Sequence, residues 1–246
     1  MTRIRACVVS RERNAIRHRH RRLTTILILV KLAILDWNPA RGDRITPDST
    51  RQYYERHAAD YAAMTLHAPV EHHWRQFERG LQAAATILDL GCGAGRDLRH
   101  FQAIGLKPVG VDSSLPLLLQ ARKLTSAPVV VGDLRALPFA PSSFEGVWAL
   151  ASLHHLKRDE VLAVLKELRN VLRPHGRFLA TVKMGIGQEV DRYGRFFAYY
   201  RDEEWRYLLG RAGFQVLSIT VDHERRSASN GGAHEVEWLC SVAARS

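Results

Sequence analysis

The sequence predicts an α/β fold, a doubly wound and mostly parallel sheet of seven strands with one antiparallel strand in a C-terminal hairpin. Between residues 85 and 212, short apolar segments alternate with segments whose apolar residues recur at helical spacing. Strands that are apolar on both faces are typical of a parallel sheet covered by helices on both sides. The last two apolar segments follow each other without a helix, and this predicts the hairpin.

Each element is expected from its own pattern. Seven short apolar segments are expected as strands, over residues 85–90, 107–112, 128–131, 144–151, 177–183, 214–221 and 235–243. Segments with helical spacing are expected as helices, over residues 49–64, 70–84, 96–104, 115–124, 157–173 and 202–212. Gly105 ends one of these helices, and Pro174 with Gly176 ends another. In such a sheet, ligands bind at the carboxyl ends of the strands.

The chain of 246 residues carries a net charge of +11, and most of that charge lies near its start. Residues 1–45 hold eleven Lys and Arg against three Asp and Glu, a net of +8, which leaves +3 for the other 201 residues. We therefore expect residues 1–45 to be a basic and apolar extension outside the fold, and residues 46–246 to form one domain. A dispensable extension is expected, and a secretory or membrane-anchoring segment and an arginine-rich nucleic-acid arm are the alternatives.

Two further features bear on localisation. The apolar run over residues 23–35 contains Lys31 and is shorter than the roughly 20 residues that a membrane-spanning helix needs, so no membrane association is expected. Cys7, Cys92 and Cys240 lie far apart and form no C-x-x-C pair, which indicates neither a disulfide framework nor a metal site. These features favour a cytoplasmic protein.

The stretch LDLGCGAGRDLRHF, over residues 88–101, joins the first predicted strand to its helix. Its glycines make G-x-G-x-G (Gly91, Gly93 and Gly95), whereas the dinucleotide fingerprint is G-x-G-x-x-G. Asp89 precedes the loop and would repel a phosphate group, but it suits a ligand that carries an ammonium group. Cys92 is expected to contribute its backbone.

Two more acids follow the next two strands. Asp112 ends the second strand 21 residues after Gly91, where an acid accepts ribose hydroxyls in nucleoside-binding folds. Asp133 ends the third strand, where its carboxylate can accept from an adenine amino group while the N–H of Leu134 meets a ring nitrogen. An Asx turn is the alternative for Asp133. Together the three acids indicate a ligand with an amine, a ribose and an adenine, which describes S-adenosylmethionine.

The chain resembles the class I S-adenosylmethionine-dependent methyltransferases over about residues 48–245. Five segments match in family order, namely ILDLGCGAG (87–95), VGVDSS (109–114), GDLRALPF (132–139), FEGVWALASLHHL (144–156) and LRPHGRFLATVK (172–183). The resemblance implies a Rossmann-like fold with S-adenosylmethionine as cofactor. It implies cofactor contacts from Asp89, Gly91, Cys92, Gly93, Gly95, Asp112, Ser113, Asp133, Leu134 and Ala149. Glu145 stands where the family usually has Asp, and His175 where it usually has Gly.

Candidates for the methyl acceptor's site lie elsewhere in the chain. His154 and His155 are candidates for a general base, of which an extended segment would turn only one toward the ligand. Residues 184–205 follow the fifth strand, where the family builds its acceptor site, and the substrate contacts expected there are Arg195, Phe196, Phe197 and Tyr199. Packing of the aromatic residues beneath the next helix is the alternative. For Tyr53 and Tyr61, the resemblance implies a lid helix over the cofactor, and core packing is the alternative. No metal site is expected, and His72 and His73 are assigned to a helix.

The function expected from these features is methyl transfer to an oxygen or nitrogen of a small-molecule acceptor. A tRNA-modifying methyltransferase is an alternative, which the nearly balanced charge after residue 45 disfavours. A cofactor-binding protein without transfer activity is another alternative. An NAD-dependent oxidoreductase is disfavoured because the chain has no Tyr-x-x-x-Lys pair. The oligomeric state remains open.

Overall fold

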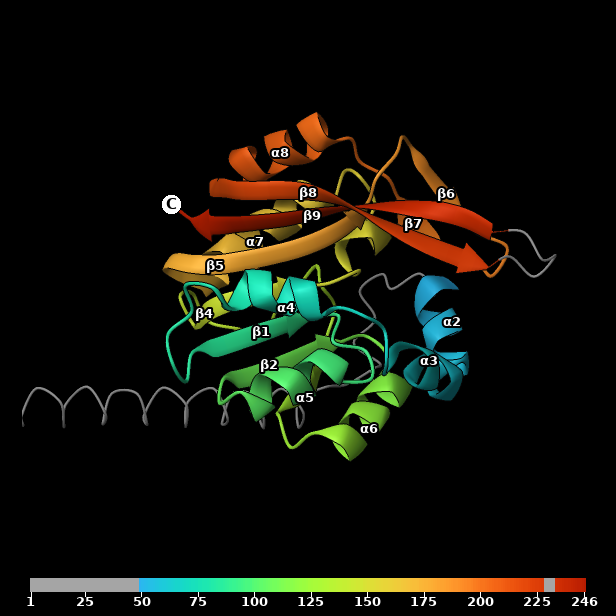
Figure 1. The fold of residues 1–246 in the computed structure, drawn as a ribbon, viewed down its shortest axis with the longest axis horizontal. Coiled ribbons are helices and arrows are strands. Elements are labelled where there is room, and N and C mark those ends of the chain that lie inside the picture. The colour runs from blue at the N-terminus through green and yellow to red at the C-terminus, as the bar shows by residue number, and fades with distance from the viewer. Residues whose placement is uncertain (1–48, 228–232) are drawn as a thin grey trace, which may run out of the picture. The chain divides into compact units, whose positions relative to one another are not determined.

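A computed structural model describes residues 49–227 and 233–246. Its main sheet has seven strands in the order β3-β2-β1-β4-β5-β9-β8 (Figure 1). These strands are β1 (Thr86–Leu90), β2 (Lys107–Asp112), β3 (Val129–Val131), β4 (Phe144–Ala149), β5 (Leu172–Lys183), β8 (Phe214–Ser227) and β9 (Ala233–Arg245). The helices are α2 (Ser49–Arg56), α3 (Ala58–Thr65), α4 (Glu71–Glu78), α5 (Arg96–Ala103), α6 (Leu115–Leu124), α7 (Val161–Val171) and α8 (Asp202–Arg211).

The topology confirms the predicted fold class. β1 pairs in parallel with both β2 and β4, β3 pairs in parallel with β2, and β5 pairs in parallel with β4. β9 pairs antiparallel with both β5 and β8, so it is the single antiparallel strand of this sheet. The strand order reverses between β1 and β4, and ligands bind at such a switch point, at the carboxyl ends of the strands.

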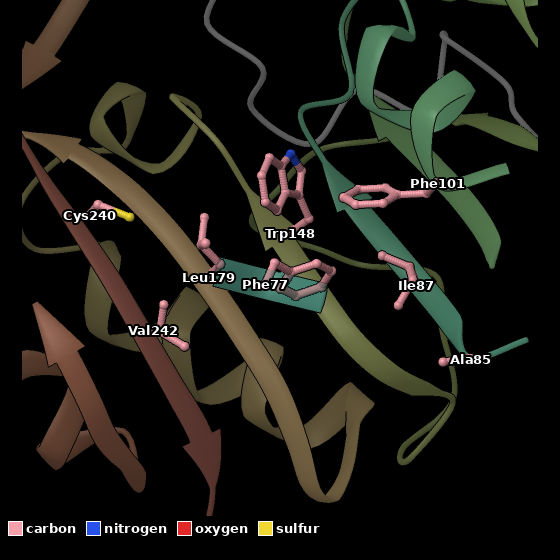
Figure 2. Packing of buried hydrophobic residues seen from close by; sticks show 8 residues of the cluster. All are labelled: Phe77, Ala85, Ile87, Phe101, Trp148, Leu179, Cys240 and Val242. Atoms are coloured by element: carbon pink, nitrogen blue, oxygen red, sulfur yellow. The ribbon is translucent and has the colours of Figure 1, made fainter. Parts of the chain in front are cut away.

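Helices cover both faces of the sheet. In Figure 1, α4 and α5 lie in front of the sheet and α7 lies behind it. The core under α4 and α5 is a cluster of buried residues (Figure 2), namely Phe77, Ala85, Ile87, Phe101, Trp148, Leu179, Cys240 and Val242. The rings of Phe77 and Phe101 both lie edge-on against Trp148, with centroids 5.3 and 5.2 Å from its ring. Because Phe77 is fully buried, α4 is fixed on the sheet.

Several element bounds differ from the expected ones. The helix expected over 49–64 is divided into α2 and α3, because the backbone of His57 leaves the helical conformation. The helix expected over 70–84 ends at Glu78, because the backbone of Arg79 leaves the helical conformation. The connection over residues 184–205 contains a two-stranded hairpin that the sequence did not indicate, β6 (Gln188–Val190) with β7 (Phe196–Ala198).

The two departures from the family pattern have structural consequences. The carboxylate of Glu145 accepts a hydrogen bond of 2.6 Å from the backbone N–H of Thr86 and pairs with Arg173, so the longer side chain joins the starts of β4 and β1. His175 has a φ of +60°, the left-handed conformation that favours the glycine usual at this place. The turn at His175 therefore has the left-handed conformation usual at this place, although histidine adopts it less readily than glycine.

The predicted extension over residues 1–45 lies outside the described residues. Within residues 49–227 and 233–246, none of the helices has the length and apolar character needed to cross a membrane.

Candidate functional site

The glycine loop follows β1 and leads into α5. Gly91, Gly93 and Gly95 have φ values of +73°, +52° and +85°, which favour glycine at all three positions. A Cβ at Gly91 would lie 2.6 Å from the Cβ of Ser152, and one at Gly95 would lie 2.9 Å from the Cα of Ala121. Gly91 and Gly95 are therefore needed for packing. A Cβ at Gly93 would meet only the ring of Tyr61, at 3.7 Å, so Gly93 is the position that a ligand could approach.

Asp112 lies at the carboxyl end of β2 and holds the loop in place. Its Oδ2 accepts a hydrogen bond of 2.9 Å from the N–H of Gly93, and its Oδ1 accepts one of 2.8 Å from the N–H of Ser114. Burial raises the pKa of Asp112, and hydrogen bonds from the backbone of Ser114, Gly93 and Ser113 oppose that shift. Each carboxylate oxygen has a second lone pair, so Asp112 keeps capacity for a ligand's hydroxyl groups.

Asp89 in β1 is a buried carboxylate with an unsatisfied oxygen. Asp89 is only 2 % exposed, and its Oδ2 has no hydrogen-bond partner among the described residues. Burial raises the pKa of Asp89 well above its ordinary value, the neighbouring Asp97 raises it further, and Arg96 opposes both. A buried carboxylate without a partner is costly, and a ligand's ammonium group would relieve that cost. The donor set at this edge therefore fits S-adenosylmethionine.

Asp97 is a member of the site that the sequence reasoning missed. It accepts hydrogen bonds from the indole N–H groups of Trp74 in α4 and Trp148 in β4, at 2.9 and 3.0 Å, and from the guanidinium of Arg96 at 2.8 and 2.9 Å. Because buried indoles need acceptors, the two tryptophans were the available signal. Asp97, which lies in α5, thus ties α4 and α5 to β4 of the sheet.

The remaining expected cofactor residues lie at the same edge of the sheet. Asp133 follows β3 and forms an Asx turn, the expected alternative, because its Oδ1 accepts a hydrogen bond of 2.9 Å from the backbone N–H of Arg135. The carboxylate of Asp133 also forms an ion pair with the guanidinium of Arg135. Ala149 ends β4 and is fully buried. Cys92 packs its sulfur against Gly110 of β2, and burial raises the pKa of its thiol well above its ordinary value, so its side chain is a packing group.

The helices α2 and α3 place tyrosines over the glycine loop. Tyr61 lies beside Gly93, and its ring meets that of Tyr54 edge-on, with centroids 5.0 Å apart. Tyr54 and Tyr61 also pack against a small cluster that includes Ala58 of α3 and Leu117 of α6. Tyr53 points elsewhere, because its ring lies 5.7 Å from that of Tyr193, next to the β6–β7 hairpin. Of the two predicted lid tyrosines, only Tyr61 lies at the loop.

His154 and His155 lie in a 3-10 turn over Leu153–His155, so the expectation of an extended segment is wrong. Their rings lie close together, with centroids 4.3 Å apart, because a tight turn does not alternate its side chains as a strand does. His154 is 2 % exposed and packs against the rings of Phe197 and Trp238. His155 is the more accessible of the two.

His155 connects α2 to the β6–β7 hairpin. Its Nδ1 lies 2.7 Å from the carbonyl oxygen of Phe196, which can only accept, so we assign the ring proton to Nδ1. The Nε2 of the neutral ring then accepts the hydrogen bond of 3.0 Å from the hydroxyl of Tyr54. Tyr54, which the sequence reasoning did not single out, is therefore the tyrosine that contacts a candidate base.

The expected substrate residues divide into two groups. Arg195 forms an ion pair of 2.7 Å with Asp191 and stacks over Tyr53, with 4.6 Å between its guanidinium carbon and the ring centroid. The N–H of Phe196 donates to the hydroxyl of Thr50 at 2.8 Å, so Arg195 and Phe196 hold α2 on the hairpin. Phe197 instead faces His154 and His155.

Lys183 and Tyr199 complete this region. Lys183, at the end of β5, is a further residue that the sequence reasoning missed; its Nζ lies 3.5 Å from the centre of the Phe197 ring. The hydroxyl of Tyr199 bonds to Glu189 across the hairpin, and burial together with that carboxylate raises the pKa of Tyr199. The carboxyl end of β5 is thus lined by an ammonium group, aromatic rings and two imidazoles.

Comparison with known proteins agrees with this arrangement. Residues 87–176 match the family model described as a methyltransferase domain. A protein of Encephalitozoon cuniculi (strain GB-M1), provisionally named as a methyltransferase, is 33 % identical over 201 residues, which cover 70 % of this chain and 90 % of that protein.

Other relatives match over a smaller part of their length. Malonyl-[acyl-carrier protein] O-methyltransferase of Pseudescherichia vulneris is 34 % identical over 98 residues, 39 % of this chain and 38 % of that enzyme. O-methyltransferase resE of Aspergillus sclerotiorum is 29 % identical over 175 residues, 63 % of this chain and 65 % of that enzyme.

A solved structure shares the fold. The 1,6-didemethyltoxoflavin-N1-methyltransferase of Burkholderia thailandensis, crystallised with 1,6-didemethyltoxoflavin and S-adenosylhomocysteine, superposes with a TM-score of 0.66 at 22 % identity, over 85 % of this chain and 93 % of that one. The sequence match to the Encephalitozoon protein extends over nearly all of that relative, and the motifs around the glycine loop fall inside the matched domain. The chain therefore belongs to the class I S-adenosylmethionine-dependent methyltransferases and takes S-adenosylmethionine as its cofactor.

Proposed function

We propose that this methyltransferase transfers its methyl group to an oxygen or nitrogen of a small-molecule acceptor that binds at the carboxyl end of β5. The observation that carries this proposal is the contact between Tyr54 and His155, which brings a lid residue, a candidate base and the β6–β7 hairpin together. The relatives support the same class of reaction, since two of them are named O-methyltransferases and the Burkholderia enzyme an N1-methyltransferase.

We assign the donor side of the site to the acids and the loop. Asp89 takes the amino group of the cofactor, Asp112 takes the ribose hydroxyls, and Gly93 leaves room for the methionine portion beside the backbone of Gly91. Asp133, the N–H of Leu134, Ser113, Ala149, Cys92 and Gly95 complete the proposed set. The bound cofactor supplies an electrophilic methyl group on a sulfonium sulfur, so the protein's main task is to hold the acceptor in line with it.

We assign the acceptor side to residues of the β6–β7 hairpin and of β5. Phe197 and Lys183 are proposed to contact the acceptor, because the ring and the ammonium group lie together beside the two histidines. Arg195, Phe196 and Tyr199 are proposed to act mainly by positioning, since each is already bonded to a neighbouring element.

The candidate base is His155. An acceptor hydroxyl or amine must lose a proton as its lone pair attacks, and a neutral imidazole with its proton on Nδ1 can receive that proton at Nε2. Tyr54 donates to the same Nε2, so the acceptor either replaces the tyrosine hydroxyl or passes its proton through it. His154 is proposed to support the ring of His155 by packing.

The proposal is tested by labelling. The full chain is incubated with methyl-labelled S-adenosylmethionine and a fractionated cell extract, with and without ribonuclease. We expect label in small molecules and no effect of ribonuclease; label that disappears with ribonuclease treatment would favour the tRNA-modifying alternative.

The role of His155 is tested with the acceptor found in that way. His155→Ala is expected to lower turnover at least about a hundredfold, in the range that general base catalysis contributes. It should leave the affinity for S-adenosylhomocysteine nearly unchanged. His67→Ala, at an exposed histidine, is the matched control. Unchanged turnover in His155→Ala would remove His155 from the mechanism.

A further inference from the structure

Three metal-ligating side chains converge on the α4 side of the sheet. His72 and His73 lie in the first turn of α4, and Asp222 lies in β8. One ligand atom from each lies within 4.8 Å of the other two. Within residues 49–227 and 233–246, no other group of three or more His, Cys, Asp or Glu side chains converges in this way.

Both imidazoles are directed at one carboxylate oxygen. The Nε2 of His73 lies 2.8 Å from Oδ2 of Asp222, and the Nε2 of His72 lies 3.5 Å from the same atom. In the part of the chain that the structure describes, these two histidines are the only basic side chains that pair with Asp222.

The spacing suits a small divalent ion. Ligand atoms around tetrahedral Zn²⁺, at bonds of about 2.0–2.2 Å, lie roughly 3.4 Å apart. The Nε2 of His72 and the Oδ2 of Asp222 are 3.5 Å apart, close to that value. The Nε2 of His73 lies 2.8 Å from the same oxygen, and a small side-chain movement would bring this distance to about 3.4 Å. Nitrogen ligands with one carboxylate favour Zn²⁺ over Mg²⁺, which prefers oxygen ligands throughout.

The three side chains are presented by fixed elements. α4 is anchored by fully buried Phe77, by the indole of Trp74 on Asp97, and by the carbonyl oxygen of Gln76, which accepts from Arg177 at 2.9 Å. Ligands held on fixed elements lose little freedom on binding an ion.

One side of the group is open. The exposed fraction of the side chain is 10 % for His73, 27 % for Asp222 and 46 % for His72. Water can therefore complete a four-coordinate ion from the side of His72.

We propose that His72, His73 and Asp222 form a binding site for a divalent transition metal ion of the Zn²⁺ class, with water as the fourth ligand. The ion joins the start of α4 to β8, two elements that are about 150 residues apart in the chain. Asp222 pairs in register with Trp238 of β9, and the ring of Trp238 contacts His154, so the ion would stabilise the sheet next to the proposed acceptor site. Sequence patterns do not indicate this site, because no spacing rule connects a His-His pair with one distant aspartate.

The site is tested by metal content and by spectroscopy. Full-length protein without a purification tag is equilibrated with Zn²⁺, freed of excess metal and analysed by mass spectrometry, and is titrated with Co²⁺ while visible absorption is recorded. We expect one bound ion per chain and the intense visible bands of four-coordinate Co²⁺. The ion should also raise the midpoint of thermal unfolding.

Variants locate the ion. Asp222→Asn and His72→Ala are each expected to lower metal affinity by more than about tenfold, because even the loss of an outer-shell partner commonly has that effect. The exposed His72 can be replaced with little disturbance of the core, and retained binding of S-adenosylhomocysteine verifies that each variant is folded. His67→Ala, and His18→Ala with His20→Ala in the N-terminal extension, are controls that should keep the metal. Wild-type protein without stoichiometric metal, or metal that persists in both site variants, would overturn the proposal.

Discussion

At the scale of single residues, the site is defined by two buried carboxylates with opposite surroundings. Asp97 accepts from two indoles and a guanidinium, whereas Asp89 has an oxygen with no partner among the described residues. Asp97 therefore contributes to the stability of the free protein. Asp89 lowers that stability, and this is the pattern expected of a residue kept for a ligand.

Asp89→Asn separates stability from binding. The change removes a buried charge, so we expect the free energy of unfolding of the free protein to rise by about 1 kcal/mol. The affinity for S-adenosylhomocysteine should fall at least about tenfold, because a charge-assisted hydrogen bond is lost. Urea unfolding and calorimetric titration measure the two effects, and Asp97→Asn, which should destabilise the free protein, is the contrasting variant. An Asp89→Asn protein that binds the ligand normally would contradict the assignment.

The raised pKa of Asp89 also makes ligand binding depend on pH. In the free protein its proton is lost at a pH well above the usual carboxyl range, and a bound ammonium group would lower that pKa. At a pH between the pKa of Asp89 in the free protein and its lower pKa in the complex, ligand binding releases a proton from Asp89. The affinity for S-adenosylhomocysteine should therefore fall as the pH decreases through the pKa of Asp89 in the free protein. The slope can reach about tenfold per pH unit.

Calorimetric titration between pH 5 and pH 8 tests this dependence. The raised pKa of Asp112 acts in the same direction, so Asp89→Asn should reduce the slope without removing it. An affinity that rises on acidification would show that Asp89 does not face the ligand's ammonium group.

At the scale of elements, the carboxyl end of the sheet is covered by α2 and α3, which the β6–β7 hairpin supports. The alternating pattern predicted the main-sheet strands well, because apolar segments between helices leave few other choices. The hairpin was missed because its strands are three residues long, and the exposed residues of β6 show no apolar alternation. The division between α2 and α3 was missed because His57 carries no strong helix-breaking signal.

The two lid tyrosines are distinguished by substitution. Tyr61→Ala is expected to lower the affinity for S-adenosylhomocysteine about tenfold, since its ring lies next to Gly93 and would be lost as a covering surface. Tyr53→Ala should leave that affinity within about twofold, because its ring lies against Tyr193 and Arg195. Calorimetric titration of both variants measures the difference. Equal effects would indicate that α2 and α3 act as a single body.

At the scale of the whole molecule, the proposed donor side of the site can be predicted from the sequence more readily than the proposed acceptor side. The acids at the ends of β1, β2 and β3 belong to short motifs, so the chain order alone indicates where they meet. The contact of Tyr54 with His155 joins residues 101 positions apart, and that of His73 with Asp222 joins residues 149 positions apart. Neither leaves a local pattern, so the three-dimensional fold is needed to find it.

The distribution of charge predicts that the N-terminal extension is not needed for cofactor binding. Residues 1–45 carry most of the net charge, while every residue proposed for the site lies after residue 48. A chain that begins at Thr46 should bind S-adenosylhomocysteine within about twofold of the full chain, as measured by calorimetry. A large loss of affinity, with the shortened chain still folded by circular dichroism, would place the extension in the site.

The most direct test of the account is the binding of S-adenosylhomocysteine by the full chain and by two aspartate variants. We expect one binding site per chain in the wild type, a loss of affinity of at least about tenfold in Asp112→Ala, and no loss in Asp159→Ala at an exposed position. The account is contradicted if the wild type does not bind, or if Asp112→Ala binds as tightly as Asp159→Ala.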